Sequence, residues 1–287
     1  MNKKTRDKIN SVKTTGHIWD GIEELNNPLP RWWLWTFYLT IAWGIGYTIA
    51  YPAWPLINGS TKGLLEYSTR RELGENIADH ESKNSDLVAE LNATDISDIN
   101  INDNLYRYAN ARGASVFRAQ CSQCHGSGAA GNKGYPNLLD DDWLWGGTLK
   151  QIMYSINHGI RNESDFDARY SEMPEFDELL DEKEIKSVVE YVISLSTDEY
   201  DKTFADLGSS IFFDNCVSCH GVNGSGNREQ GAPNLSDAIW LYGNSREAIE
   251  YTVRNSQFGV MPAWGQRLSE EDLRAVSVYV HNLGGGE

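Results

Sequence analysis

Residues 121–126 read CSQCHG and residues 216–221 read CVSCHG, and these two stretches determine how the chain is organised. Each contains a Cys-x-x-Cys-His motif, and together they hold all 4 cysteines of the 287-residue chain. This motif is the covalent attachment site of c-type haem. Two thiols at this spacing can add to the two vinyl groups on one porphyrin edge, and the following histidine can reach the iron. We therefore expect two haems c on Cys121, Cys124, Cys216 and Cys219, with His125 and His220 as axial iron ligands.

The sequence around the two motifs is itself repeated. The triplet Pro136-Asn137-Leu138 recurs 97 residues later as Pro233-Asn234-Leu235. The pair Met173-Pro174 recurs 88 residues later as Met261-Pro262. Gly113 recurs 95 residues later as Gly208, and Trp143 recurs 97 residues later as Trp240. One structural unit is therefore expected to occur twice.

Each repeat ends in a helix. Apolar residues recur at i, i+3, i+4 and i+7, which indicates an amphipathic helix, and Asp181 and Ser269 are typical helix starts. No stretch alternates with the period of a strand. The sequence predicts a mainly α chain with two tandem class I cytochrome c domains, at residues 104–198 and 199–287.

The second axial ligand of each iron is expected downstream of its motif. Met173 and Met261 stand in equivalent positions before the closing helices, whereas the other two methionines have no counterpart in the repeat. Imidazole and thioether together raise the iron potential and leave no open position for oxygen or peroxide. A methionine can also simply fill a core. His158 and His281 are alternative ligands, but neither has a repeat partner.

Prolines and tryptophans are expected to surround the iron ligands. Pro136 and Pro233 follow their histidines by 11 and 13 residues, an interval at which a carbonyl can accept the imidazole N–H and fix its tautomer. Trp143, Trp145 and Trp240 are expected to pack against the haems or to donate to a propionate.

Two other chemistries use paired cysteines. One zinc ion could bind both pairs, but 91 residues separate Cys124 from Cys216, far beyond the usual interval. A thioredoxin-like redox motif requires a strand–helix context that the sequence does not indicate. Neither alternative explains the Met-Pro pairs.

The N-terminal region predicts a membrane anchor. Residues 32–61 contain no charged side chain, and residues 32–51 form a twenty-residue apolar and aromatic run. A helix of that length spans about 30 Å, the thickness of a hydrocarbon core. Pro30, Pro52 and Pro55 lie outside the run, and tryptophan and tyrosine gather at both of its ends. A cleaved signal peptide would have a shorter apolar core.

Flanking charges predict the orientation of this anchor. Residues 1–31 hold six basic and four acidic side chains, including Lys3, Lys4, Arg6, Lys8 and Lys13. The chain as a whole has a net charge of −16, so the remainder is strongly acidic and unsuited to nucleic acid. We expect residues 1–60 to form a cytoplasmic N-terminus and a single span of the bacterial inner membrane. The haem domains would be periplasmic, joined by an acidic linker at 61–103 in which His80 is a surface residue. Parts of this linker, around 64–75 and 87–91, are expected to be helical.

The sequence resembles a known family on several stretches. GHIWDG at 16–21 and ELNNPLPRWW at 24–33 match the pattern that precedes the span in the diheme cytochrome c subunit of cbb3-type cytochrome c oxidases (CcoP/FixP type, subunit III). Tyr51-Pro52, the two haem motifs and the two Met-Pro pairs also match. The resemblance covers nearly the whole chain, and the linker is the part that matches least.

The resemblance implies electron transfer without catalysis by this chain alone. Such subunits take electrons from periplasmic cytochromes c and pass them to the monohaem subunit and the haem–copper subunit, which reduces oxygen and pumps protons. It also leaves two arrangements open, in which Met173 and Met261 each serve the haem of their own repeat or of the other.

Two other functions compete with that role. A membrane-tethered diheme peroxidase would need an iron with an open position. A general periplasmic electron shuttle or haem-based sensor would not need the N-terminal stretch at 16–33.

Overall fold

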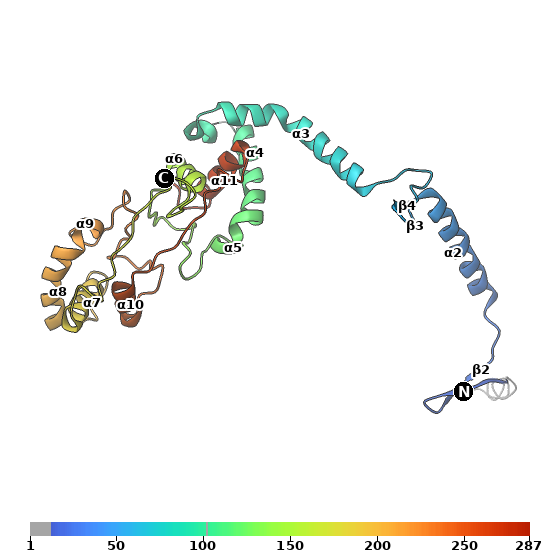
Figure 1. Cartoon of the computed structure of the whole chain (residues 1–287), viewed down its shortest axis with the longest axis horizontal. Helices are drawn as coiled ribbons and strands as arrows, with labels where there is room; N and C mark the ends of the chain where they lie inside the picture. The colour runs from blue at the N-terminus through green and yellow to red at the C-terminus, as the bar shows by residue number, and fades with distance from the viewer. Residues whose placement is uncertain (1–12, 102) are drawn as a thin grey trace. The chain divides into compact units, whose positions relative to one another are not determined.

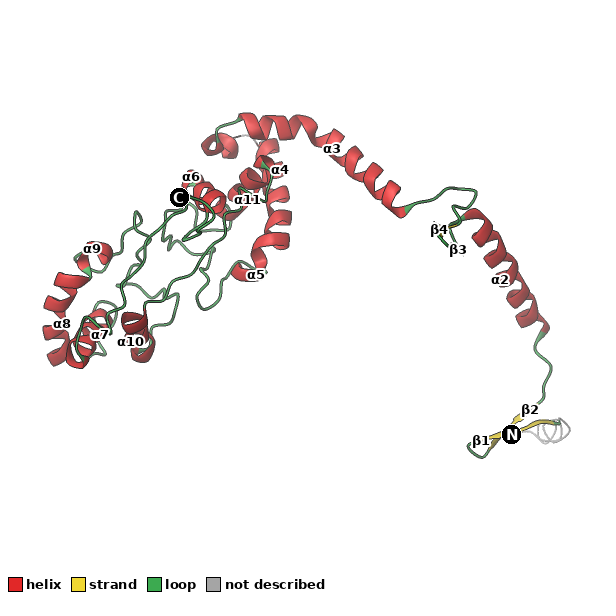
Figure 2. Cartoon of the chain, viewed as in Figure 1, coloured by secondary structure: helices red, strands yellow, loops and turns green. Residues whose placement is uncertain are grey.

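The computed structural model describes residues 13–101 and 103–287, and these fall into two units that meet between Ser82 and Lys83. Figure 1 follows the chain by residue number, and Figure 2 shows that helices and loops dominate it. Lys3, Lys4, Arg6 and Lys8, on which the expected orientation partly depends, lie outside the described residues.

The N-terminal unit begins with a β-hairpin that was not expected from the sequence. Strands β1 (Thr14–Trp19) and β2 (Ile22–Leu25) pair antiparallel, with Trp19 opposite Ile22. The two loop residues, Asp20 and Gly21, have φ angles of 50° and 79°, as a type I′ turn requires. Every strand residue is exposed. A lone two-stranded hairpin is marginally stable in water, so this one depends on further contacts for its stability.

Helix α2 (Arg31–Ala50) forms where the uncharged run begins. It starts directly after Pro30 and ends before Tyr51, whose extended backbone is the conformation favoured by a residue preceding proline. None of its residues is buried. Among the described residues, no helix combines the length and the apolar character required of a membrane span. A short pair of strands, β3 (Pro55–Leu56) and β4 (Gly59–Ser60), follows.

The acidic linker is more ordered than the expected tether. Helix α3 (Thr69–Ala93) occupies most of it, and a 3₁₀ segment, η1 (Ile96–Ile101), follows. Leu91, Ile96 and Ile99 are at most 6% exposed and pack in one cluster with Leu105 and Ala109. The end of the linker is therefore part of a hydrophobic core, because its few apolar side chains are buried there.

The C-terminal unit consists of helices joined by loops. They are α4 (Asp103–Val116), the π-helical turn η2 (Phe117–Cys121), α5 (Ser122–His125), α6 (Leu149–His158), α7 (Glu182–Ser194), α8 (Lys202–Asn215), α9 (Val217–His220), α10 (Arg246–Asn255) and α11 (Glu270–His281). The predicted starts of the closing helices are confirmed. Asp181 forms a capping box with Glu184, and the Ser269 side chain accepts from the backbone N–H of Asp272.

The closing helices of the two repeats are exchanged. Helix α11, from the second repeat, packs along α4 of the first, and α7, from the first repeat, packs along α8 of the second (Figure 1). A Cβ atom on Gly113 would lie 2.0 Å from the carbonyl oxygen of Ala275, and one on Gly208 would lie 2.0 Å from that of Ser187. The two helix pairs therefore approach so closely that only glycine fits at these positions.

This exchange produces two lobes. The first lobe contains α4, α5, α6 and α11, and the second contains α7, α8, α9 and α10. Residues 159–172 run from the first lobe to the second and are called the first crossing segment; residues 256–260 run back. The ranges 104–198 and 199–287 therefore describe the two sequence repeats, but each lobe contains helices from both ranges.

Candidate haem-binding sites

Each Cys-x-x-Cys-His motif lies where a long helix gives way to a single helical turn. In the first lobe η2 ends at the first cysteine and α5 ends at the histidine; in the second lobe α8 and α9 provide the same arrangement. Gly126 and Gly221 follow with φ angles of 81° and 76°. Glycine adopts this left-handed conformation freely, so the chain turns away directly after each histidine.

Both histidines make the hydrogen bond expected from the sequence spacing. His125 Nδ1 lies 3.1 Å from the carbonyl oxygen of Pro136, and His220 Nδ1 lies 3.1 Å from that of Pro233. A carbonyl only accepts, so Nδ1 holds the proton and the lone pair of Nε2 is left for a metal. Burial lowers the pKa of both histidines, although the hydrogen bonds oppose it. The neutral, metal-binding form of the imidazole is therefore favoured.

The first cysteine of each motif is unsuited to thiol redox chemistry. Burial, and then the neighbouring cysteine, raises the pKa of Cys121 and of Cys216 to about 11. Reactive thiols have lowered pKa values. The zinc alternative gains no support either, because the two pairs belong to different lobes and no candidate metal cluster among the described residues includes a cysteine.

The exchange of closing helices determines where the methionines lie. Met173 packs in the second lobe, against the core that also contacts Cys216 and Trp240. Met261 packs in the first lobe, against the core that also contacts Cys121 and Trp143. Each methionine therefore lies in the lobe whose cysteine motif comes from the other repeat.

Backbone contacts hold both methionines in place. Met261 forms two hydrogen bonds of 3.0 Å with the backbone of Ile160, in the first crossing segment. The hydroxyl of Ser256, in the segment that runs back, donates to the carbonyl oxygen of Met173. The two crossing segments thus position the two candidate ligands.

A cavity of about 730 Å³ joins the candidate ligands of the second lobe. Met173, Cys216, Cys219 and His220 line it together with Trp240. Apolar side chains form much of the remaining wall, among them Phe176, Val188, Val192, Phe212 and Ile249. Pockets of this size and character bind cofactors. A wall with an imidazole and a thioether fits a flat macrocycle that contains iron.

Two of the three tryptophans donate their indole N–H to a backbone carbonyl. Trp143 Nε1 donates to the carbonyl oxygen of Gly285, and Trp240 Nε1 donates to that of Asp237 at 3.2 Å. These two were expected to pack near a haem or to donate to it, and the backbone bonds leave them only the packing role. Trp145 differs, because its buried Nε1 has no hydrogen-bond partner.

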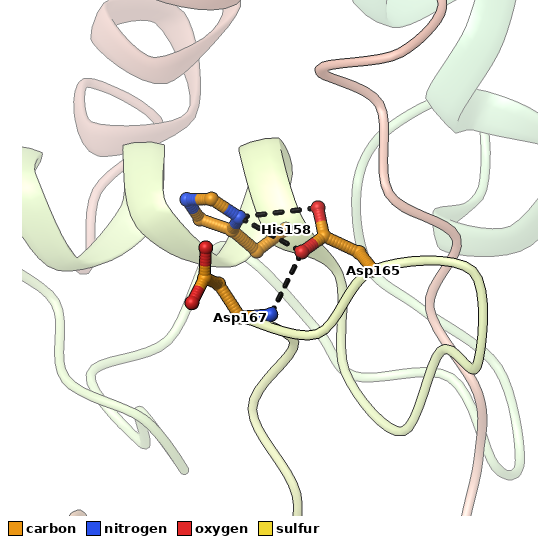
Figure 3. A group of neighbouring side chains, drawn as sticks. All are labelled: His158, Asp165 and Asp167. Atoms are coloured by element: carbon orange, nitrogen blue, oxygen red, sulfur yellow. Dashed lines mark hydrogen bonds and ion pairs between the residues drawn. The ribbon is translucent and has the colours of Figure 1, made fainter.

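The alternative histidine ligands have other partners. Figure 3 shows His158 against Asp165, with Nδ1 3.1 Å from Oδ2 of that carboxylate. Its Nε2 lies 2.9 Å from Nδ2 of Asn157, so both ring nitrogens are engaged. The backbone N–H of Asp167 donates to Asp165 at 2.9 Å. This cluster fastens the first crossing segment to α6. His281 lies on the chain end instead, where Nε2 is 3.0 Å from the carbonyl oxygen of Glu287.

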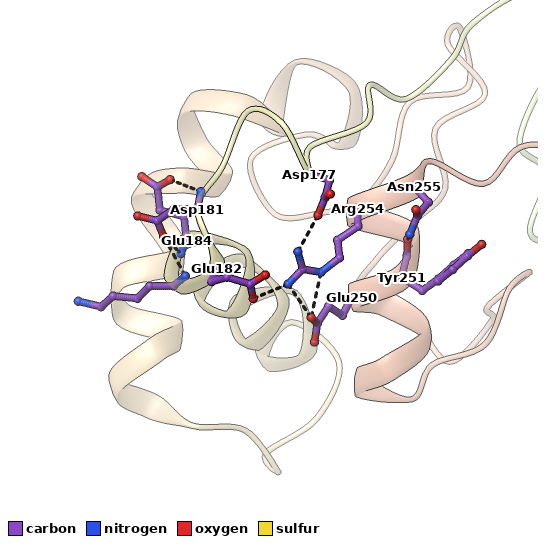
Figure 4. A network of polar contacts seen from close by, with 9 residues as sticks. Asp177, Asp181, Glu182, Glu184, Glu250, Tyr251, Arg254 and Asn255 are labelled. Atoms are coloured by element: carbon purple, nitrogen blue, oxygen red, sulfur yellow. Dashed lines mark hydrogen bonds and ion pairs between the residues drawn. The ribbon is translucent and has the colours of Figure 1, made fainter.

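An ionic network fastens the second lobe and was not expected from the sequence. Arg254 of α10 contacts Asp177 and Glu182 at 2.7 Å and Glu250 at 2.9 Å (Figure 4). The hydrogen bonds that Arg254 donates to these carboxylates raise its pKa. The network joins α10 to the start of α7, shortly after Met173. Only the three-dimensional structure brings the four side chains together.

Two models of known protein families match the chain, one at its N-terminal part and one over the two repeats. Residues 11–58 match the N-terminal domain of cytochrome oxidase-cbb3, FixP. Residues 109–192 and 204–280 match cytochrome c oxidase, cbb3-type, subunit III. The second match covers both repeats.

Curated relatives match nearly from end to end. The chain is 56% identical over 287 residues to the cbb3-type cytochrome c oxidase subunit CcoP of Cereibacter sphaeroides, covering 99% of both chains. It is 47% identical over 281 residues to subunit FixP of Sinorhizobium medicae, covering 98% of this chain and 97% of the relative. It is 49% identical to CcoP of Rhodobacter capsulatus, covering 100% of both. The chain therefore belongs to the subunit III family of cbb3-type cytochrome c oxidases, together with CcoP and FixP.

Proposed function

We propose that this chain is the electron-entry subunit of a cbb3-type cytochrome c oxidase and that it binds two haems c. Membership of the family makes it an electron-transfer subunit of that oxidase, and haem c is the cofactor of its cytochrome c family. The main support for the number two is that each lobe has its own cysteine motif, histidine–proline hydrogen bond and methionine.

The exchanged packing supports a particular ligand set. The first haem would be held by Cys121 and Cys124, and the second by Cys216 and Cys219. Their irons would bind His125 with Met261, and His220 with Met173. Histidine and methionine together raise the reduction potential and occupy both axial positions. Each haem would then accept and release electrons without binding oxygen or peroxide, as an electron-entry subunit requires and a peroxidase does not.

Helix α2 would anchor the chain in the bacterial inner membrane. Its large side chains face outward without a cover in the N-terminal unit: Trp35, Leu39 and Trp43 are 74%, 71% and 73% exposed. Lys62 is the first charged residue after Arg31. Basic flanks favour the cytoplasmic side, so the N-terminus would stay in the cytoplasm and both lobes would lie in the periplasm.

The partners follow from this position. Electrons would arrive from periplasmic cytochromes c and leave to the monohaem cytochrome c subunit and the haem–copper catalytic subunit. Two His/Met haems in adjacent lobes support transfer through this chain in single-electron steps, with no bond made or broken in the protein.

The proposal is tested on the full chain purified from membranes. We expect two covalently bound haems per chain, no thiol open to alkylation, and oxidase subunits among the co-purifying chains. Replacing Cys121 and Cys124 by serine should leave one haem, and the same change at Cys216 and Cys219 is the matched control. A wild-type chain that has fewer than two covalent haems, or reactive thiols, would contradict the proposal.

A further inference from the structure

Two arginines of the first crossing segment lie between the lobes and form no direct ion pair with a described carboxylate. Arg161 Nε donates to the carbonyl oxygen of Gly259 at 2.7 Å, and Nη1 donates to that of Ser171 at 2.9 Å. Arg169 Nη2 lies 3.4 Å from the carbonyl oxygen of Gln151. Among the residues that the structure describes, no Asp or Glu forms an ion pair with either arginine.

Both guanidinium groups are partly removed from water. Burial lowers the pKa of Arg161 and of Arg169, since a buried charge is disfavoured unless an opposite charge lies close by. Arg254 provides a comparison within the same chain. Its side chain is 18% exposed, and three carboxylates surround it. The charge of Glu172 acts on Arg161 in the opposite direction to burial, but neither crossing-segment arginine forms the direct ion pairs that Arg254 has.

Unpaired polar atoms mark the same region. Trp145 Nε1 and Arg169 Nε are the two buried side-chain nitrogen or oxygen atoms without a hydrogen-bond partner among the described residues. Trp145 is 7% exposed, and the guanidinium carbon of Arg169 lies 5.3 Å from the centre of its ring. A buried donor without an acceptor destabilises the folded protein. Two such donors on neighbouring side chains provide a place where one acceptor group could bind to both.

The tryptophan reaches across to the other lobe. A Cβ atom on Gly231 would lie 2.2 Å from Trp145 Cε2 and 2.6 Å from Nε1, so the indole packs closely against the loop that leads to Pro233. The repeat places Tyr242 97 residues after Trp145, and Tyr242 correspondingly lies against Gly134, 3.4 Å from the equivalent Cβ position. Arg161 and Tyr242 both line the cavity that contains His220 and Met173.

We propose that Arg169 with Trp145, and Arg161 with Tyr242, bind the propionate carboxylates of the haems and thereby set the haem reduction potentials. This inference rests on the proposed presence of two haems. Haem has two propionate carboxylates, which must be compensated when they leave water. A planar guanidinium fork matches a carboxylate, and an indole N–H adds a neutral donor. The chain supplies cations and donors at this interface, and the cofactor supplies the missing anions.

The direction of the effect on potential follows from charge. Oxidised iron has one positive charge more than reduced iron, so an uncompensated propionate stabilises the oxidised form. Arginine cancels that negative charge and favours reduction. Removing the arginine should therefore lower the potential of the haem that it serves. It should also raise the pKa of the propionate, because the ionised form loses its partner.

Redox titration of the full-length protein, followed by absorption spectra, tests the inference. Arg169→Gln and Arg161→Gln should each shift the reduced-to-oxidised ratio of one haem three- to tenfold towards oxidation, where tenfold equals 59 mV for one electron. The pH-dependent part of the potential should move to higher pH. Arg169→Lys keeps the charge and should recover most of the shift. Lys150→Gln is the control, because it removes one charge from an exposed ion pair on α6 and should change neither potential.

The outcomes separate this inference from the proposed function. Unchanged potentials in variants that retain two His/Met haems would overturn the inference alone, and so would a lysine variant that behaves like the glutamine variant. A chain without covalent haem would overturn the proposed function. If Arg169→Gln does not fold, Trp145→Phe keeps an aromatic ring, although a smaller one, and removes the N–H donor. It should lower one potential by a smaller amount, and an unchanged potential there counts against the inference.

Discussion

Met173 and Met261 are equivalent in the sequence, and local backbone contacts decide which lobe each one joins. Both precede proline and both stand shortly before a closing helix, so the sequence alone permits either pairing with a cysteine motif. Met261 belongs to the second repeat but is hydrogen-bonded to Ile160 of the first. Met173 belongs to the first repeat but is hydrogen-bonded to Ser256 of the second. We therefore expect each iron to take its imidazole and its sulfur from different repeats.

Variants with a single haem test this pairing. When Cys121 and Cys124 are replaced by serine, only the second-lobe haem remains. In that chain Met173→Ala should change the absorption spectrum and lower the potential by more than about 59 mV, or tenfold, because the thioether ligand is lost. Met261→Ala is the matched control and should leave the spectrum unchanged. The opposite result would mean that each methionine serves the haem of its own repeat.

Sequence spacing predicted the individual contacts that depend on a few neighbouring residues. The carbonyl oxygens of Pro136 and Pro233 accept from the histidines at the intervals that suggested them. Trp145 was expected from the sequence as a possible donor to a propionate, but Arg169 was not. The role of Arg169 depends on an unpaired buried atom, and a missing partner becomes visible only when the surrounding backbone is in place.

At the level of helices, the amphipathic pattern predicted α7 and α11 but could not predict their exchange. Both helices present the same apolar spacing, and both can pack on a helix with glycine at the crossing point, Gly113 or Gly208. Because the two closing helices have the same apolar spacing, the hydrophobic pattern does not distinguish the two arrangements. In the structure, residues 159–172 and 256–260 connect the lobes in the exchanged arrangement.

Two elements differ from the expectation for different reasons. Short helical stretches were expected near both ends of α3, but not one continuous helix. Leu91 is its one residue found buried, and a solvated helix leaves little signal in the sequence. The β1–β2 hairpin, in contrast, has a clear signal. Asp20-Gly21 between Trp19 and Ile22 is a typical two-residue hairpin loop and could have been recognised.

Deletion of residues 16–31 tests the role of this hairpin. Ile18, Trp19 and Ile22 are 68%, 70% and 69% exposed, a surface suited to contact with other subunits. All candidate haem ligands lie in the other unit, at 83–287. We expect the deleted protein to bind both haems but to lose co-purification with the oxidase.

A milder pair of variants provides the control for that deletion. Replacing Trp19 and Ile22 by serine should weaken co-purification, whereas replacing the exposed polar residues Thr15 and Glu24 by alanine should not. If the deleted protein still co-purifies with oxidase subunits, the hairpin has no docking role.

The whole molecule has a charge imbalance that bears on its partners. The net charge is −16, and residues 1–31 contribute more basic than acidic side chains, so the excess of carboxylates lies after residue 31. Charge of one sign keeps a domain soluble, and it also attracts partners of the opposite sign. A donor cytochrome with a basic face would therefore meet this chain faster than a neutral one.

The dependence of the reduction rate on ionic strength shows whether the negative charge attracts a donor or only keeps the protein soluble. Exposed charges are screened over about 8–10 Å at 0.1–0.15 M salt, and complementary charge acts mainly on the rate of encounter. The rate at which a basic donor cytochrome reduces the chain, measured by stopped-flow absorption, should fall at least about tenfold between low and high salt. A small uncharged reductant is the matched control, because its encounter rate does not depend on the charge of the protein. If the cytochrome and the uncharged reductant show the same flat salt profile, the carboxylates serve solubility alone, and docking depends on apolar contact.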